Sequence, residues 1–203
     1  EFEIDALFKE AEKRTDSKRG RTTHFILSIL FGSGMRASEL CGLTIENTPF
    51  ILGVDQLKVL GKGSKFRTVT ILPELSEYIA WYIKNIRRYL VRRPMRKRDW
   101  TQPLLLRENG KSYDRQLLWR RIHNLGIRAS LDKSAGVHRC RHSYGTHAYR
   151  NGVDIVTLQR QLGHENVNTT TIYARADASK TQEKLEKVNI LRLRRPFPEQ
   201  TAS

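Results

Sequence analysis

Apolar residues recur at helical spacing in several stretches of this chain. The spacing predicts a first helix over residues 2–13 and a second over residues 24–30, separated by a polar turn. Glycines at positions 32 and 34 then predict another turn, after which a short helix resumes near Ser38. Isoleucines at helical spacing predict a longer helix over residues 75–90. Helices therefore account for most of the predicted elements.

Two other stretches, residues 54–60 and 66–72, alternate between apolar and polar positions as β-strands do. The link between them is short and contains glycine, in Gly61-Lys62-Gly63-Ser64-Lys65. This pattern predicts a β-hairpin with Lys62 at its tip. The run Leu104-Leu105-Leu106 is a candidate third strand.

A further short helix is predicted after the turn Asn151-Gly152-Val153-Asp154, whose aspartate is a typical N-cap. Its buried stripe is expected to consist of Ile155, Leu158 and Leu162, and Gly163 is expected to end it. An unbroken helix would put His164 and Tyr173 on opposite faces, because each residue turns the helix by about 100°. The asparagines and threonines between them predict a break and a new helix start near the tyrosine.

The chain has 203 residues, enough for one well-buried domain and too few for two. Its 37 Lys and Arg exceed its 21 Asp and Glu, and the resulting charge of +16 favours an anionic polymer, nucleic acid first, as partner. A basic membrane-binding helix would gather its charge opposite one apolar face, but here the basic residues are scattered. The densest run, residues 87–98, is typical of a solvated helix end, and phosphate contact by it stays open.

No apolar run approaches the length of a membrane span, and the first residues lack the pattern of a signal peptide. The two cysteines, Cys41 and Cys140, do not indicate a disulfide framework. We therefore expect a cytoplasmic, DNA-associated protein without membrane contact. The chain starts without methionine and opens almost directly into a helical pattern, so we expect a fragment cut at a domain boundary.

Several motifs suit attack by a tyrosine hydroxyl on a phosphodiester. A tyrosine, Tyr173, follows His164 by nine residues, and His138 and Arg141 stand in His-Arg-Cys-Arg-His. Because the hydroxyl has a pKa near 10, it attacks only if its proton is removed or the transition state is strongly stabilised. Arginines supply that stabilisation, since their planar fork donates paired hydrogen bonds to non-bridging oxygens. Arg36 and Arg141 are the candidates for this grip.

Protons must also move during such a reaction. Histidine titrates near neutrality, so His138 or His164 can transfer a proton or hydrogen-bond to a phosphate oxygen. A lysine on a hairpin tip, Lys62, can protonate the departing 5′ oxygen. We expect Glu39 to orient the Arg36 guanidinium rather than to act as a base.

The histidines and the cysteine of this region also suggest a zinc site. Two arginines lie inside the cluster, however, and no partner Cys or His pair has finger-like spacing. We therefore expect no metal, and interpret His142 and His147 as structural side chains hydrogen-bonded within the helix of Arg141.

In order and spacing, the motifs resemble the catalytic boxes of the tyrosine recombinases, the Xer and phage integrase family. Any one box is weak evidence, but five in register are strong. The resemblance runs from about the first helix to Ala176 and rests on residues 34–40, Gly61-Lys62-Gly63, residues 138–142, Leu162-Gly163-His164 and Tyr173.

The resemblance implies the tyrosine recombinase catalytic-domain fold, mainly α with a small antiparallel β-sheet. It implies a site-specific DNA recombinase, or integrase, that cleaves and rejoins strands through a 3′-phosphotyrosyl intermediate. The bond energy is retained in that intermediate, so no small-molecule cofactor and no metal are needed. The implied partner is double-stranded DNA, with a homotetramer on two duplexes. The implied catalytic residues are Arg36, Lys62, His138, Arg141, His164 and Tyr173.

Residues 1–176 are expected to form the catalytic domain, and residues 177–203 a C-terminal helix and tail that is a candidate to dock on a neighbouring protomer. The family's N-terminal DNA clamp has no counterpart in this chain. Two other functions stay open. One is a topoisomerase-like enzyme that nicks and closes one duplex with the same chemistry, and the other is an inactive basic DNA-binding module.

Four further basic side chains are candidate DNA phosphate contacts, although each can equally be a solvated surface charge. One of them, Lys65, also competes with Lys62 as the general acid, and we favour Lys62 on its glycine flanks and the family register. The four are Lys65, Arg67, Arg139 and Arg175.

Overall fold

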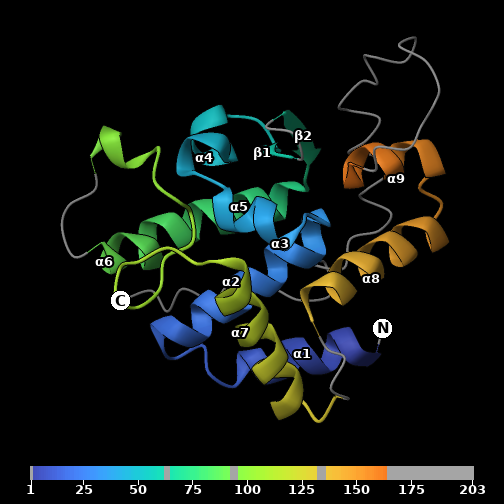
Figure 1. The fold of residues 1–203 in the computed structure, drawn as a ribbon, viewed down its shortest axis with the longest axis horizontal. Helices are drawn as coiled ribbons and strands as arrows, with labels where there is room; N and C mark the ends of the chain where they lie inside the picture. The colour runs from blue at the N-terminus through green and yellow to red at the C-terminus, as the bar shows by residue number, and fades with distance from the viewer. Residues whose placement is uncertain (1, 62–64, 92–95, 132–135, 164–203) are drawn as a thin grey trace.

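The computed structural model describes residues 2–61, 65–91, 96–131 and 136–163 (Figure 1). Over these ranges the fold is mainly helical with one two-stranded antiparallel sheet, which confirms the predicted class. In chain order the elements are α1 Phe2–Glu12, α2 Lys18–Ser33, α3 Ala37–Gly42, the 3-10 turn Ile45–Asn47, α4 Pro49–Leu52, β1 Gln56–Leu60, β2 Phe66–Thr70, α5 Pro73–Tyr82, the π-helical turn Ile83–Arg87, α6 Arg88–Leu90, the 3-10 turn Lys97–Asp99, α7 Arg115–Arg128, α8 Val137–Arg150 and α9 Ile155–Leu162.

Helix α2 forms the centre of the core, where it packs against α1, α5, α7 and α8. Its ring of Phe25 stacks on Tyr82 of α5 with centroids 3.8 Å apart. The helix begins earlier than the apolar pattern predicted, because Ser17 caps it by accepting a hydrogen bond from the Gly20 amide. Gly20 also lets α2 pass close to the turn that follows α1, since a Cβ there would lie 1.6 Å from the Arg14 carbonyl oxygen.

The predicted hairpin is confirmed. Strands β1 and β2 pair antiparallel from Gln56↔Thr70 to Leu60↔Phe66, so the loop that contains Lys62 joins them at one end. Lys62 itself lies outside the described residues. In Figure 1 the sheet lies beside α4, on the side of the molecule opposite α1.

The candidate third strand at Leu104-Leu105-Leu106 is wrong. These leucines are buried, but within the described ranges they add no strand to the sheet. The Leu104 amide donates instead to the Leu43 carbonyl, and only isolated bridges form around the run. An apolar run shows that a segment is buried, but it does not show which backbone pairs with it.

The helix predicted over residues 75–90 is present as α5, the π-helical turn and α6 in succession, with its isoleucines Ile79, Ile83 and Ile86 buried as expected. Arg87, at the start of the basic run, is not a solvated side chain. It is 1% exposed, and its Nε and Nη2 donate to the Pro103 carbonyl at 3.0 and 2.8 Å. This arginine holds the loop after the basic run against the helix.

Helix α9 has the predicted cap and end. The Asp154 carboxylate accepts from the Thr157 amide, and Gly163 ends the helix with φ of 66°. Leu158 and Leu162 are buried, but Ile155 is 53% exposed, so its predicted place in the buried stripe is wrong. Ile155 occupies the first helical turn of α9.

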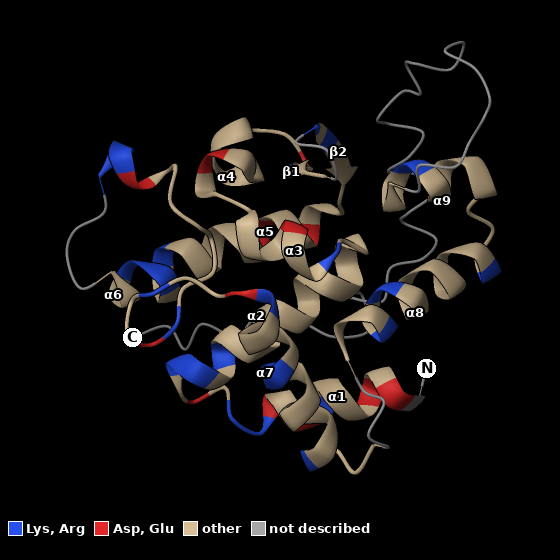
Figure 2. Ribbon diagram, in the orientation of Figure 1, with Lys and Arg blue, Asp and Glu red and all other residues tan. Residues whose placement is uncertain are grey.

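Positive charge is spread over the molecule rather than gathered on one helix. Figure 2 shows Lys and Arg on α2, α6, α7 and α8. Both cysteines are free thiols. Among the helices that the structure describes, none combines the length and the apolar character needed to cross a lipid bilayer.

Candidate active site

Arg36 lies at the N-cap of α3, directly after the left-handed turn at Gly34. This agrees with the prediction that it stands at a turn that enters a short helix. A Cβ at Gly34 would lie 2.5 Å from the ring of Tyr144 on α8, and its φ is +64°, so both space and backbone conformation require glycine here. The close approach of the turn to α8 brings Arg36 towards the helix that carries Arg141.

Glu39 fixes the orientation of Arg36, as predicted. Its carboxylate accepts from the Arg36 amide at 2.7 Å and from Arg36 Nη1 at 3.0 Å. The side chain is buried, and burial pushes its pKa upward, but hydrogen bonds from Arg67 and from Arg36 outweigh this and hold the pKa below its ordinary value. Glu39 is therefore a buried anion at neutral pH that organises cations around it.

Arg141 reaches the same place from α8. Its Nη1 donates to the Gly34 carbonyl at 2.8 Å, across 107 positions of sequence, and its Nη2 donates to the Leu162 carbonyl at 2.5 Å. Burial, together with the neighbouring Arg36, lowers the pKa of Arg141 to about 10, so the guanidinium remains charged at neutral pH. A clamp on a phosphate requires that permanent charge.

Three arginines meet at the last carbonyls of α9. Arg36 Nη2 donates to the Gly163 carbonyl at 2.7 Å, Arg141 to that of Leu162, and Arg67 Nη1 to that of Gln161 at 2.6 Å. The C-terminal carbonyls of a helix lack intrahelical partners and carry partial negative charge, so cations are stabilised there. The next residue in the chain is His164. The described residues therefore bring both predicted arginines to the point from which the chain continues towards His164.

Arg67 was predicted as a phosphate contact, and the structure gives it protein partners at all three guanidinium nitrogens. Nε and Nη2 donate to Glu39 at 3.1 and 2.9 Å, and Nη1 donates to Gln161. Its side chain is 17% exposed. The sequence analysis did not predict this role. Strand alternation did contain a signal for it, since Arg67 lies on the same strand face as the buried Val69.

Gln161 is a second functional candidate that sequence reasoning missed. It is 4% exposed, its amide nitrogen donates to the Thr70 carbonyl at 2.6 Å, and its amide oxygen accepts from the Thr70 amide at 3.2 Å. The side chain thus pairs with the end of β2 as a neighbouring strand would. Together with Arg67 it joins α9 to the strand that follows the Lys62 loop.

His138 lies in the first turn of α8, exposed, one helical turn before Arg141. It lines a cavity of about 570 Å³ together with Ala37, Arg115, Gln116, Trp119, Arg120 and Val137. The cavity therefore opens between the starts of α3, α7 and α8, next to Arg36.

Two of the predicted phosphate contacts lie on the surface of the molecule, and the remaining candidate site residues fall outside the described ranges. Arg139 is exposed and pairs with Glu3 of α1 at 3.1 Å, and Lys65 is exposed just before β2. Lys62, His164, Tyr173 and Arg175 lie outside the described residues, as does the tail from 177 to 203. Among the residues with described positions, no group of three or more His, Cys, Asp or Glu side chains is arranged to hold a metal ion.

Comparisons with known proteins agree with this geometry. The sequence model of the phage integrase family matches residues 1–180. Over 178 residues, the chain is 35% identical to the tyrosine recombinase XerD of Staphylococcus aureus, which covers 87% of this chain and 57% of that protein. The chain thus spans little more than half the length of this relative.

Solved structures of similar proteins share the fold. The crystal structure of XerA recombinase superposes with a TM-score of 0.67 at 26% identity, over 93% of this chain and 64% of that one. The XerH site-specific recombinase bound to difH substrate, in a pre-cleavage complex, gives a TM-score of 0.64 at 26% identity, over 89% of this chain and 50% of that one.

Proposed function

This chain belongs to the phage integrase family, and on that premise we propose that it is the catalytic part of a site-specific DNA recombinase that cleaves and rejoins strands through Tyr173. The observation that carries the proposal is the meeting of Arg36 and Arg141 at the end of α9, one residue before His164. Each guanidinium has five N–H donors, and protein acceptors use only some of them. The remaining donors suit the two non-bridging oxygens of one phosphodiester.

The reaction exchanges one ester for another. The Tyr173 oxygen attacks phosphorus, the bond from phosphorus to the 5′ oxygen breaks, and the DNA 3′ end becomes a phosphotyrosyl ester. The departing oxygen takes a proton from Lys62, while His138 or His164 accepts the tyrosine proton or donates a hydrogen bond to a phosphate oxygen. Rejoining is the reverse, with a 5′ hydroxyl as nucleophile. The arginine pair lowers the barrier in both directions because it neutralises charge that develops on the phosphate oxygens.

The proposed partner is double-stranded DNA, which the net charge of +16 supports. The relative XerH is a site-specific recombinase bound to its difH substrate. We extend the proposal to a homotetramer on two duplexes, in which residues 177–203 dock on a neighbouring protomer and residues 1–176 carry the catalytic groups. No metal or small-molecule cofactor takes part, since the phosphotyrosyl bond keeps the energy needed for rejoining.

The test is a trapping experiment with nicked duplexes. Duplexes that bind this chain are selected from a randomised library, nicked beside the bound site, and incubated with the chain, with nicked difH DNA in parallel. A recombinase is expected to give a protein–DNA band that survives detergent. The short strand released by the nick diffuses away with its 5′ hydroxyl, so the cleaved strand cannot be rejoined and the covalent complex accumulates. A DNA-binding module without an active site gives no such band. Exchange of strands between two labelled duplexes distinguishes a recombinase from a topoisomerase, which relaxes one duplex without joining two.

Lys62 has its own test on the same substrates. Lys62→Ala is expected to slow cleavage about a hundredfold, because the 5′ oxygen then leaves without a proton. A 5′-bridging phosphorothioate should restore the rate, since sulfur leaves without protonation. Lys58→Ala, at an exposed position on β1 of the same hairpin, is the matched control and should change neither substrate's rate. If the sulfur substrate rescues Lys65→Ala and not Lys62→Ala, the general acid is Lys65.

A further inference from the structure

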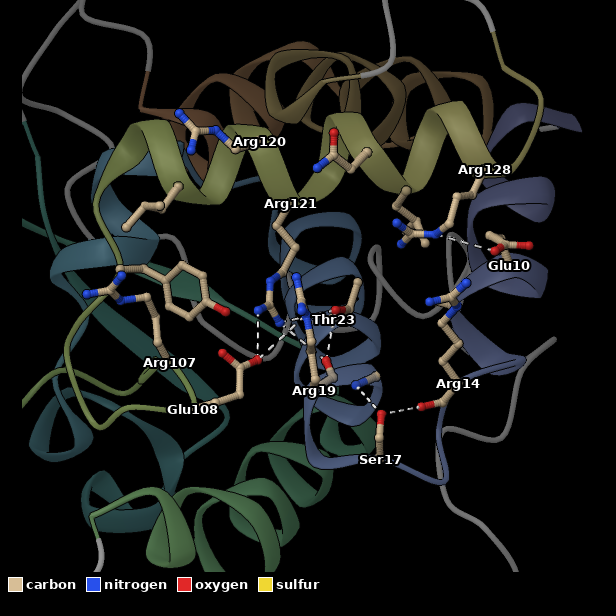
Figure 3. A pocket seen from close by; sticks show the side chains of 16 residues that line it. Glu10, Arg14, Ser17, Arg19, Thr23, Arg107, Glu108, Arg120, Arg121 and Arg128 are labelled. Atoms are coloured by element: carbon tan, nitrogen blue, oxygen red, sulfur yellow. Dashed lines mark hydrogen bonds and ion pairs between the residues drawn. The ribbon is translucent and has the colours of Figure 1, made fainter.

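A second cavity lies away from the arginine pair, between the end of α1, the start of α2, helix α7 and the segment from Arg107 to Tyr113. Its volume is about 410 Å³, within the range of small-molecule sites. None of the residues proposed for cleavage lines it. Figure 3 shows the side chains that converge on it from these separate elements.

The lining carries a surplus of positive charge. It contains six arginines and only two carboxylates, with Ser17, Thr23, Tyr113 and Asn124 as further polar groups. The charged side chains are Arg14, Arg19, Arg107, Arg120, Arg121 and Arg128, with Glu10 and Glu108. Gathering this many arginines around one hollow is unfavourable unless an anion shares it.

Both carboxylates are already engaged. Glu108 accepts from Arg121 at 2.8 Å and lies 4.0 Å from Arg19, and Figure 3 shows the three side chains meeting on one wall. Glu10 pairs with Lys13 at 2.9 Å and with Arg128 at 3.5 Å. Among the lining residues that the structure describes, no further carboxylate balances the other arginines.

A buried donor also points to a ligand. Tyr113 is 5% exposed, and its hydroxyl has no hydrogen-bond partner among the residues that the structure places. The Nε of Arg107, another lining residue, is also buried without a partner. Burial raises the pKa of Tyr113 above its ordinary value, so the hydroxyl keeps its proton and is available as a hydrogen-bond donor.

We propose that this cavity is a phosphate-binding site, formed by the Tyr113 hydroxyl and the arginines of α2 and α7 around it. Phosphate is the anion that fits best, because its several oxygens accept from planar guanidinium groups and from a neutral hydroxyl at once. The phosphate can belong to a free polyphosphate compound or to the backbone of bound DNA. The depth of the Tyr113 hydroxyl favours the free compound, since a duplex holds its phosphates on a convex surface.

The experiment measures binding of inorganic tripolyphosphate to the whole chain by titration calorimetry at low salt. The wild type is expected to bind one equivalent, and Tyr113→Phe to bind about tenfold more weakly, the cost of one hydrogen bond to a charged group. Because this hydroxyl has no partner among the described residues, its removal should not lower the melting temperature. Tyr144→Phe is the matched control, a buried tyrosine outside the cavity, and should bind as the wild type does.

A second arm uses duplex DNA, with affinity measured across a salt series. If the ligand is a backbone phosphate, tripolyphosphate binds weakly, but Tyr113→Phe and Arg19→Gln both lower duplex affinity, and Arg19→Gln reduces the salt slope by about one. Arg150→Gln, at an exposed position of α8, is the control. The proposal is overturned if Tyr113→Phe matches Tyr144→Phe with both probes. This arm rests on the proposed DNA partner, but neither arm needs strand cleavage, so their failure and the failure of the recombinase proposal are separate results.

Discussion

A Tyr173→Phe variant is expected to form no covalent complex with a nicked duplex, while it still binds that duplex with wild-type affinity. The change removes a single oxygen atom, which is the proposed nucleophile, and leaves the basic surface intact. We expect the loss of adduct to be complete, because no other hydroxyl is proposed beside the arginine pair. Detergent-resistant complexes and non-covalent binding are measured on the same DNA.

The matched control is Tyr149→Phe, a tyrosine on α8 that is 63% exposed and has no proposed role in cleavage. It should form adduct at the wild-type rate. An adduct that persists in Tyr173→Phe would remove this residue as the nucleophile. Loss of duplex binding in Tyr173→Phe would instead show that the tyrosine holds DNA, and the cleavage proposal would then lack its central group.

Arg141→Ala is expected to slow cleavage by about a thousandfold, the upper range for loss of one preorganised donor group in a transition state. The guanidinium also joins Gly34 to the end of α9, so its loss leaves two carbonyl acceptors to find other partners. We therefore expect a fall in stability of about 1–3 kcal/mol as well. Single-turnover cleavage and thermal unfolding are measured on the same preparation, below the melting temperature of the variant.

Arg141→Lys separates the two effects of that change. Lysine keeps the charge but cannot donate the paired hydrogen bonds of the fork, so most of the rate loss should remain while part of the stability returns. Arg150→Ala, an exposed arginine on the same helix, controls for general loss of positive charge. Equal rates for Arg141→Lys and wild type would show that only charge matters here and that no fork holds the phosphate.

Local pattern was sufficient for much of the candidate site. The glycine turn before Arg36 and the glycine that ends α9 both follow from spacing and residue type. Each is decided within one or two helical turns of chain. Local chemistry also predicted that Glu39 would orient Arg36, since three positions on a helix bring two side chains together.

Other features needed contacts between distant segments. The sequence predicted Arg67 as a surface cation, but its three guanidinium nitrogens donate to Glu39 and to the Gln161 carbonyl. The basic run likewise did not indicate that Arg87 is buried and donates to the Pro103 carbonyl. The leucine run at 104–106 is buried, but it pairs with a loop rather than with the sheet that the sequence predicted. In each case the acceptor is a backbone carbonyl or a buried carboxylate from elsewhere in the chain, and residue type alone cannot identify that acceptor.

The sequence by itself determined the helices predicted from their apolar spacing, the hairpin, the excess of positive charge and the ordered motifs that mark the family. Those properties depend on residue type and short-range spacing. Only the tertiary structure decided that Arg36, Arg67 and Arg141 share the end of α9, and that a hollow between α1, α2 and α7 holds a surplus of arginines around an unpaired hydroxyl. These depend on which donor meets which acceptor, and packing fixes that pairing between residues as many as 127 positions apart.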